Sequence, residues 1–158
     1  MRDVKVEIKG LKEVQDAIRS FDGDISRQLN LIVNAAALES INDVKKAIQG
    51  PPKTGRKYKR NRLSSVVHQA SAKGEAPATD TGFLVSSIYN EDRGYLSKAI
   101  GSRLDYAYYL EFGTFRMGGP SGARPSWVPA VERAIPKMLK RVNIAIAKAK
   151  ARAEKTTK

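Results

Sequence analysis

The sequence predicts an α+β fold, in which a small antiparallel sheet packs against two long helices and a long basic loop joins the parts. Apolar residues recur at helical spacing over residues 25–48 and again over 128–149. They alternate with polar residues at strand spacing over 4–8, and in a weaker form over 96–100. A basic stretch between these segments keeps neither period. Together the two periods indicate a mixed fold class.

The length of the chain predicts one domain. A chain of 158 residues is long enough for a single hydrophobic core. We place the domain over 3–150, with 50–79 as a long basic loop or arm and 151–158 as a charged, disordered tail. An apolar content of 41 % and a charged content of 28 % suit a folded protein. No window has the apolar length of a signal peptide or a membrane span, so we expect no membrane partner.

The first two predicted elements are a strand and a helix. The strand carries apolar residues at alternate positions, namely Val4, Val6 and Ile8, and Gly10 ends it. The helix begins near Leu11 and stops at a turn that contains Gly23.

The clearest helix in the sequence follows this turn. Its apolar residues form one stripe at steps of three to five: Ile25, Leu29, Ile32, Ala36, Ala37, Ile41, Val44 and Ile48. Asp24 is suited to cap its first turn. Gly50, Pro51 and Pro52 end it, because proline cannot continue a helix.

The second half of the sequence predicts a short strand, a hairpin and two helices. The short strand falls within 65–71, inside the basic loop, and the hairpin pairs 86–91 with 96–101 around a turn at 92–94. A short aromatic helix then runs over 106–112, closed by Gly113. The last helix begins with Pro129 in its first turn, is kinked by Pro136 and continues to about Ala149.

Positive charge is concentrated in two segments. The net charge is +13, with seven basic residues and one acid over 53–75, and eight basic residues and one acid over 137–158. The remaining chain is therefore neutral. This distribution indicates contact with a polyanion or an acidic partner at one loop and one tail.

The residue types needed for most catalytic and metal sites are missing. The chain has no cysteine and a single histidine, His68, so a zinc site would need carboxylates for its other ligands. Glu75 and Asp80 lie near His68 in an aperiodic loop, where no spacing fixes their geometry. Helix capping and surface pairing account better than a nuclease centre for acids such as Asp105 and Glu111. We expect no enzyme activity, no catalytic or metal-binding residue and no cofactor.

The basic loop contains a cluster suited to phosphate contact. DNA contact is weighed evenly against a solvated loop or contact with an acidic protein surface for its six candidate contact residues: Lys53, Arg56, Lys57, Lys59, Arg60 and Arg62. No base-reading module is present, so DNA binding here would be sequence-nonspecific and sensitive to salt.

Three ordered motifs cover the region after this loop. The first has the form T-G-x-L-x-x-S-I and consists of Thr81, Gly82, Leu84, Ser87 and Ile88. The second has the form Y-A-x-Y-x-E-F-G-T and consists of Tyr106, Ala107, Tyr109, Glu111, Phe112, Gly113 and Thr114. The third has the form A-R-P-x-x-x-P-A and consists of Ala123, Arg124, Pro125, Pro129 and Ala130. Together with the opening segment, residues 6–14, the motifs resemble the tail-completion or head-tail neck component family of long-tailed bacteriophages, which is related to the lambdoid minor tail protein Z. The resemblance covers about residues 3–150.

The resemblance implies a virion structural protein without enzymatic activity, made in the host bacterial cytoplasm. It implies a homo-oligomeric ring, six-fold by the family's expectation, around the DNA channel. Its partners would be further copies of itself, the adjacent head-closure and tail-terminator or tail tube proteins, and the genomic DNA that passes through, bound nonspecifically. Two departures from the family pattern are a longer glycine-rich loop before Ala123 and the proline at 136.

Two alternative interpretations accompany this one. A sequence-nonspecific nucleic-acid-binding accessory protein would use the same basic loop and the basic tail. The second is a purely structural interpretation of the motifs. In it, Gly82 and Gly113 permit tight turns, and the core is filled by Tyr106, Tyr109 and Phe112. Residues 68–84, which lead into the first motif, are expected to form an extended docking arm rather than a catalytic loop.

Overall fold

The predicted α+β class is confirmed in the computed structural model of the chain, which describes residues 23–59, 61–63 and 65–156. The expected strand over 4–8 and the helix from Leu11 lie outside the described residues. The elements follow in the order α2 (Gly23–Gln49), β1 (Lys57–Lys59), β2 (Val67–Gln69), α3 (Phe83–Ser86), β3 (Ile88–Gly94), β4 (Ser97–Ser102), α4 (Tyr106–Phe112), two short 3-10 helices η1 (Phe115–Met117) and η2 (Gly119–Gly122), and α5 (Trp127–Thr156).

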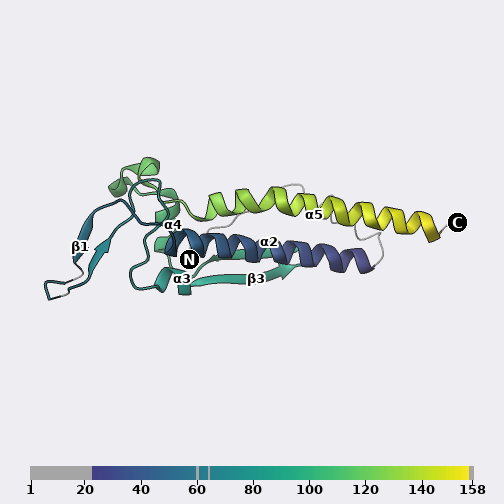
Figure 1. Cartoon of the computed structure of the whole chain (residues 1–158), viewed down its shortest axis with the longest axis horizontal. Helices are drawn as coiled ribbons and strands as arrows, with labels where there is room; N and C mark the ends of the chain where they lie inside the picture. Colours follow the sequence, from purple (N-terminus) through teal and green to yellow (C-terminus); the bar gives the residue numbers. More distant parts are fainter. Residues whose placement is uncertain (1–22, 60, 64, 157–158) are drawn as a thin grey trace.

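Helices α2 and α5 lie side by side along the long axis of the molecule and run in opposite directions (Figure 1). Their ion pairs show this order, because acids along α2 meet arginines along α5 in reverse sequence: Asp24 with Arg152, Glu39 with Arg141 and Asp43 with Arg133. These pairs are exposed, so each contributes little to stability. Most of the apolar stripe predicted for α2 is buried, namely Leu29, Ala36, Ala37, Ile41, Val44 and Ile48, whereas Ile25 and Ile32 are half-buried.

A two-stranded antiparallel sheet covers another side of α2 (Figure 1). Strands β3 and β4 pair from Ile88 with Ser102 to Asp92 with Lys98, and an irregularity follows at Arg93. The predicted hairpin is thus present, but its turn lies at 95–96 and not at 92–94. Leu96 takes a left-handed φ of 53° there, which is costly for leucine, and it is buried against Leu29 of α2. Burial of the leucine side chain offsets the strain and draws the turn to this position.

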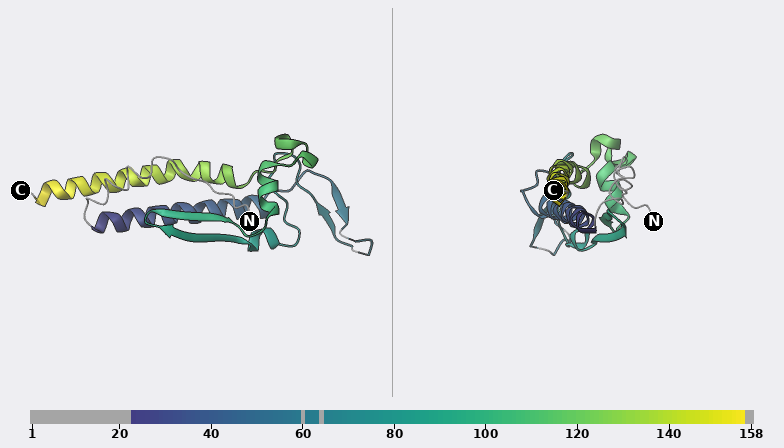
Figure 2. Two further views of the ribbon diagram at one scale, coloured as in Figure 1. Left: turned by 180° about the vertical axis from the view of Figure 1, so that it is seen from behind. Right: turned by 90° about the vertical axis from the view of Figure 1, so that its right-hand side faces the viewer.

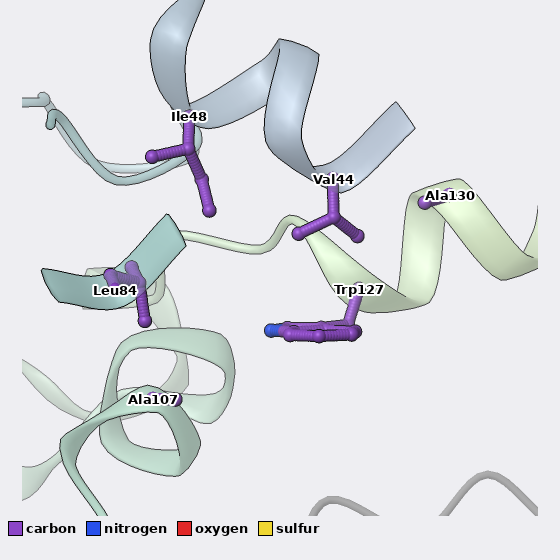
Figure 3. Packing of buried hydrophobic residues seen from close by; sticks show 6 residues of the cluster. All are labelled: Val44, Ile48, Leu84, Ala107, Trp127 and Ala130. Carbon is purple, nitrogen blue, oxygen red and sulfur yellow. The ribbon is translucent and has the colours of Figure 1, made fainter. Parts of the chain in front are cut away.

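The main hydrophobic core lies where α5 begins (Figure 3). Its buried residues come from four helices: Val44 and Ile48 from α2, Leu84 from α3, Ala107 from α4, and Trp127 and Ala130 from α5. Figure 3 shows the Trp127 ring between Val44 and the pair Leu84 and Ala107. This cluster holds the two short helices against the two long ones.

Helix α5 is longer than predicted at both ends. It begins at Trp127, two residues before Pro129, and continues through Pro136 without a break. Pro136 is exposed, so water can satisfy the carbonyl that proline leaves without a donor. The helix also continues past Ala149 to Thr156, so most of the segment 151–158, expected as a disordered tail, is helical. The segment is rich in alanine, lysine, arginine and glutamate, which favour helix without any apolar stripe.

The basic loop contains a second antiparallel hairpin. The short strand predicted within 65–71 is present as β2, and it pairs with β1, which was not predicted. We call β1, β2 and the described residues between them, 61–63 and 65–66, the basic hairpin. It projects from the end of the bundle opposite the C-terminus, as Figure 1 and the left view of Figure 2 both show.

Replacing Ile48 by alanine is expected to destabilise the fold by about 2–5 kcal/mol, because the side chain is 1 % exposed in the main core. The measurement is chemical denaturation of the purified chain. Leu31→Ala is the matched control, since Leu31 lies on the same helix at 62 % exposure and should change stability by less than about 0.5 kcal/mol. Equal losses in the two variants would contradict this core.

Candidate functional site

The three motifs meet at one end of the helix pair. The first motif forms α3 and the start of β3, the second forms α4, and the third leads into α5. One apolar residue of each lies in the main core, namely Leu84, Ala107 and Ala130, and Ile88 packs against its edge. The motifs therefore build a single structural unit, which we call the motif junction.

The Glu111 carboxylate holds the motif junction together. It is 4 % exposed and accepts hydrogen bonds from the backbone N–H groups of Ser126 (2.7 Å), Trp127 (3.0 Å) and Val128 (2.8 Å). These N–H groups belong to the first turn of α5 and to the residue before it, and helix N–H groups at this position have no partner within their own helix. The negative charge also lies at the positive end of the helix dipole. Glu111 of α4 is thus the N-terminal cap of α5.

Two neighbours of Glu111 in the second motif shape the chain after α4. Gly113 has a φ of 76°, and a side-chain carbon there would lie 2.2 Å from the carbonyl oxygen of Gly119. Only glycine fits this position. The Thr114 hydroxyl accepts a hydrogen bond from the Met117 N–H at 3.3 Å and begins η1. The turn role expected for Gly113 is confirmed.

Polar residues of the first motif join α3 to the sheet. Gly82 precedes α3 with a left-handed φ of 79°, which confirms its expected turn role, and the Thr81 hydroxyl accepts a hydrogen bond from the Phe83 N–H at 3.4 Å. The Ser87 hydroxyl donates to the Leu84 carbonyl at 2.8 Å and lies 2.6 Å from the Ser102 hydroxyl of β4. These short bonds fix the angle at which α3 enters β3.

The third motif connects the junction to the segment below the basic hairpin. Arg124 donates from its backbone N–H to the Leu110 carbonyl at 2.7 Å, and from its side chain to the Ser71 carbonyl at 3.2 Å. The Ala123 carbonyl accepts from the Gly74 N–H at 2.9 Å. Pro125 follows this connection, and Pro129 sits in the first turn of α5, where proline costs no helical hydrogen bond. Backbone and side-chain hydrogen bonds therefore join the motif junction to the segment that follows the basic hairpin.

The aromatic residues of the second motif do not fill the core as the structural interpretation expected. Tyr106, Tyr109 and Phe112 are 43–44 % exposed, and Phe115 in the following η1 is 97 % exposed. The inward face of α4 is instead set by Ala107 and Glu111, which are one turn apart and buried. The Tyr108 ring contacts those of Tyr109 and Phe112, with ring centroids 5.9 and 4.9 Å away. We call Tyr106, Tyr109, Phe112 and Phe115 the aromatic surface.

The candidate contact residues of the basic loop divide into two groups. Lys53 folds back and donates to the Ala47 carbonyl of α2 at 2.7 Å, and desolvation lowers its pKa against the opposing effect of Glu75. The exposed candidates Arg56, Lys57, Lys59 and Arg62 are in or beside the basic hairpin. Arg60 lies outside the described residues. The structure thus gives Lys53 a capping contact and leaves the other four cations facing solvent.

The Glu75 carboxylate fastens the two ends of the hairpin segment. It accepts hydrogen bonds from the Thr54 N–H at 3.1 Å, the Thr54 hydroxyl, and the Ala72 N–H at 2.8 Å. These bonds stabilise the ionised form and lower the pKa of Glu75 to about 2. Sequence reasoning noted Glu75 only as a neighbour of His68, because its partner Thr54 lies far away along the chain.

His68 takes a structural place in the basic hairpin. Its ring lies edge-on to Tyr58 with centroids 5.1 Å apart, and its Nδ1 is 3.5 Å from Oδ1 of Asp80. Within residues 23–59, 61–63 and 65–156, no three His, Asp or Glu side chains come together as a group that could hold a metal ion.

Comparison with family models, curated proteins and solved structures found no match for this chain. Among the helices in the described part of the chain, none combines the length and the apolar character needed to cross a membrane.

Replacing Glu111 by alanine is expected to lower the free energy of unfolding by at least about 2 kcal/mol, because it leaves buried N–H groups at the start of α5 without an acceptor. Denaturant unfolding measures the loss. Glu132→Ala, an exposed glutamate on α5, is the control and should stay within about 0.5 kcal/mol. The capping role fails if both variants unfold at the same denaturant concentration.

Glu75→Gln is expected to destabilise the chain in a pH-dependent way. The folded pKa of about 2 lies below the ordinary 4.5, so the ionised carboxylate favours the folded state. Its contribution is complete above pH 4.5 and is lost as the pH falls towards 2. The difference in thermal midpoint between the chain and the variant should therefore be constant at higher pH and shrink across this window. An NMR titration that gives Glu75 a pKa near 4.5 in the folded chain would contradict the proposed role of its hydrogen bonds to Thr54 and Ala72.

Proposed function

We propose that the chain is a structural protein of the bacteriophage head-tail junction, a subunit of a ring that joins the head-closure and tail-terminator rings around the DNA channel. The resemblance of its three ordered motifs to the tail-completion family supports this proposal. The motifs lie far apart in the sequence, and each contributes an apolar residue to the same core.

The aromatic surface is the observation that carries the proposal. Four large aromatic side chains on α4 and η1 are left exposed, and the second motif supplies three of them. Solvent-exposed aromatic groups of this kind are typical of protein interfaces, where they bury a large area at low entropic cost. A helix whose aromatic residues served packing alone would turn these rings inward, as α4 does Ala107.

A second exposed apolar surface lies elsewhere on the molecule. Leu139 and Ile144 on α5 are 52 % and 47 % exposed, and with Pro136 and Ala147 they line a shallow groove. A closed ring needs two different contact surfaces on each subunit, because every copy meets its neighbours head to tail. The aromatic surface and this groove meet that requirement, and a six-subunit ring follows from the family expectation.

The proposed protein has no enzymatic activity and takes no cofactor, and it resides in the virion. Its partners are its own copies, the head-closure ring, the tail-terminator or tail tube proteins, and the genome in transit. The alternative, a nucleic-acid-binding accessory protein, differs in oligomeric state, since it would bind duplex DNA tightly as a monomer.

Deleting the gene from a phage that encodes this chain is expected to give filled heads and separate tails, visible by electron microscopy, with loss of infectivity. Complementation with the intact gene should restore joined particles. Complementation with Phe112→Ser and Phe115→Ser together should fail, because removal of aromatic anchors weakens an interface by about 10-fold or more. Leu31→Ser, an exposed leucine on α2, is the control and should complement. Joined, infectious particles without the gene would overturn the proposal.

A further inference from the structure

The basic hairpin is placed to reach a partner outside the body of the molecule. It projects beyond the ends of α2 and α5, clear of the helices (Figures 1 and 2). Its two strands pair only with each other in the sheet, in the register Lys57 with Gln69, Tyr58 with His68 and Lys59 with Val67. The contacts of Glu75, Arg124 and Gly74 at its base hold it in one direction. An arm fixed in this way loses little entropy when it binds.

The charge of the hairpin selects a polyanion. No acidic residue occurs between Lys53 and Lys73 in the sequence, and Arg56, Lys57, Lys59 and Arg62 are all exposed. Because side chains alternate along a strand, Lys57 and Lys59 project from one face of the ribbon, together with their cross-strand neighbours. The other face carries Tyr58 and His68, which pack on each other. One face therefore presents regularly spaced cations.

The tip of the hairpin carries an apolar group that nothing in the described chain covers. Leu63 lies midway between the two strands in sequence and is 98 % exposed, and Val66 and Val67, at the start of the returning strand, are 70 % and 52 % exposed. Phosphate contact alone does not require a leucine at this point. A basic ribbon that ends in an exposed leucine combines the two features by which architectural proteins bind duplex DNA: cations along the backbone and an apolar wedge between base steps.

We propose that the basic hairpin is a duplex-DNA-binding arm, which lies in the minor groove with Lys57, Lys59 and Arg62 on the phosphates and inserts Leu63 between two base pairs. The insertion unstacks one base step and bends the duplex without reading sequence. Another copy of the chain is a poor occupant, since a net charge of +13 makes each copy repel the basic arm of the next. The inference rests on the hairpin alone and holds whether or not the chain is a neck protein.

The cation contacts are tested by the salt dependence of binding. Purified full-length chain is titrated into a fluorescent duplex of about 30 base pairs at several salt concentrations, and the slope of log K against log salt is measured. The triple variant K57Q/K59Q/R62Q should reduce the slope by about 2–3, because each lost phosphate contact contributes about 0.9. The matched control R27Q/K46Q/R103Q removes the same charge from exposed positions outside the two basic segments and should leave the slope unchanged.

The wedge is tested by bending. A donor and an acceptor dye at the two ends of the duplex should approach each other when the chain binds. Leu63→Ser should abolish the approach while changing affinity less than about 10-fold, since the phosphate contacts remain. Leu31→Ser, an exposed leucine on α2, should bend the duplex as the unchanged chain does.

Four outcomes would overturn the inference: no duplex binding at low salt, a slope that does not change in the hairpin variant K57Q/K59Q/R62Q, bending that survives Leu63→Ser, or Leu63-dependent binding to phosphatidylserine vesicles with none to DNA. These measurements use purified protein and DNA, so their failure leaves the head-tail proposal intact. Conversely, joined particles in a gene deletion would refute the head-tail proposal without affecting the DNA-binding result.

Discussion

The Glu111 carboxylate fixes the arrangement of the rest of the structure. A buried charge is unfavourable unless hydrogen bonds and an opposite potential compensate it, and the first turn of α5 supplies both. The bond is mutual, because the N–H groups of Ser126, Trp127 and Val128 need an acceptor as much as the carboxylate needs donors. It sets the position of Trp127, around which four helices form the main core. Through Arg124, next to the capped turn, it also sets the base of the basic hairpin.

Local sequence patterns were sufficient to predict an element that buries a regular apolar face. The stripe of α2, with Gly50 and two prolines behind it, predicted that helix within a residue or two at each end. The β3–β4 hairpin was predicted from weaker alternation and turn residues, and α4 from an aromatic spacing whose side chains the structure leaves exposed. The turn of the hairpin lies later in the chain than predicted, because Leu96 gains more from burial against α2 than it loses in backbone strain. A tertiary contact of this kind cannot be recognised from the neighbouring sequence.

The parts that sequence reasoning missed depend on contacts between distant residues. Capping was one of the roles considered for Glu111, but its partner is the start of a different helix, fifteen or more residues away. Strand β1 is exposed at every position, so it shows no alternation and gains its order only from pairing with β2. The spacing of Tyr106, Tyr109 and Phe112 resembles a buried helical face. The inward face is set instead by a small and an acidic residue, which no hydrophobicity pattern would select.

The positions of the two basic segments in the elongated molecule have a consequence for how copies can approach one another. The basic hairpin lies at one end of the long axis and the basic half of α5 runs to the other (Figure 1). The rest of the sequence balances its charges, so the molecule has a neutral waist between two positive poles. Copies that touch at their waists with their long axes side by side meet little repulsion at the contact itself, but their positive ends lie close together and repel one another. In that arrangement like poles gather at the two rims of the assembly, where only a polyanion or counterions can neutralise them.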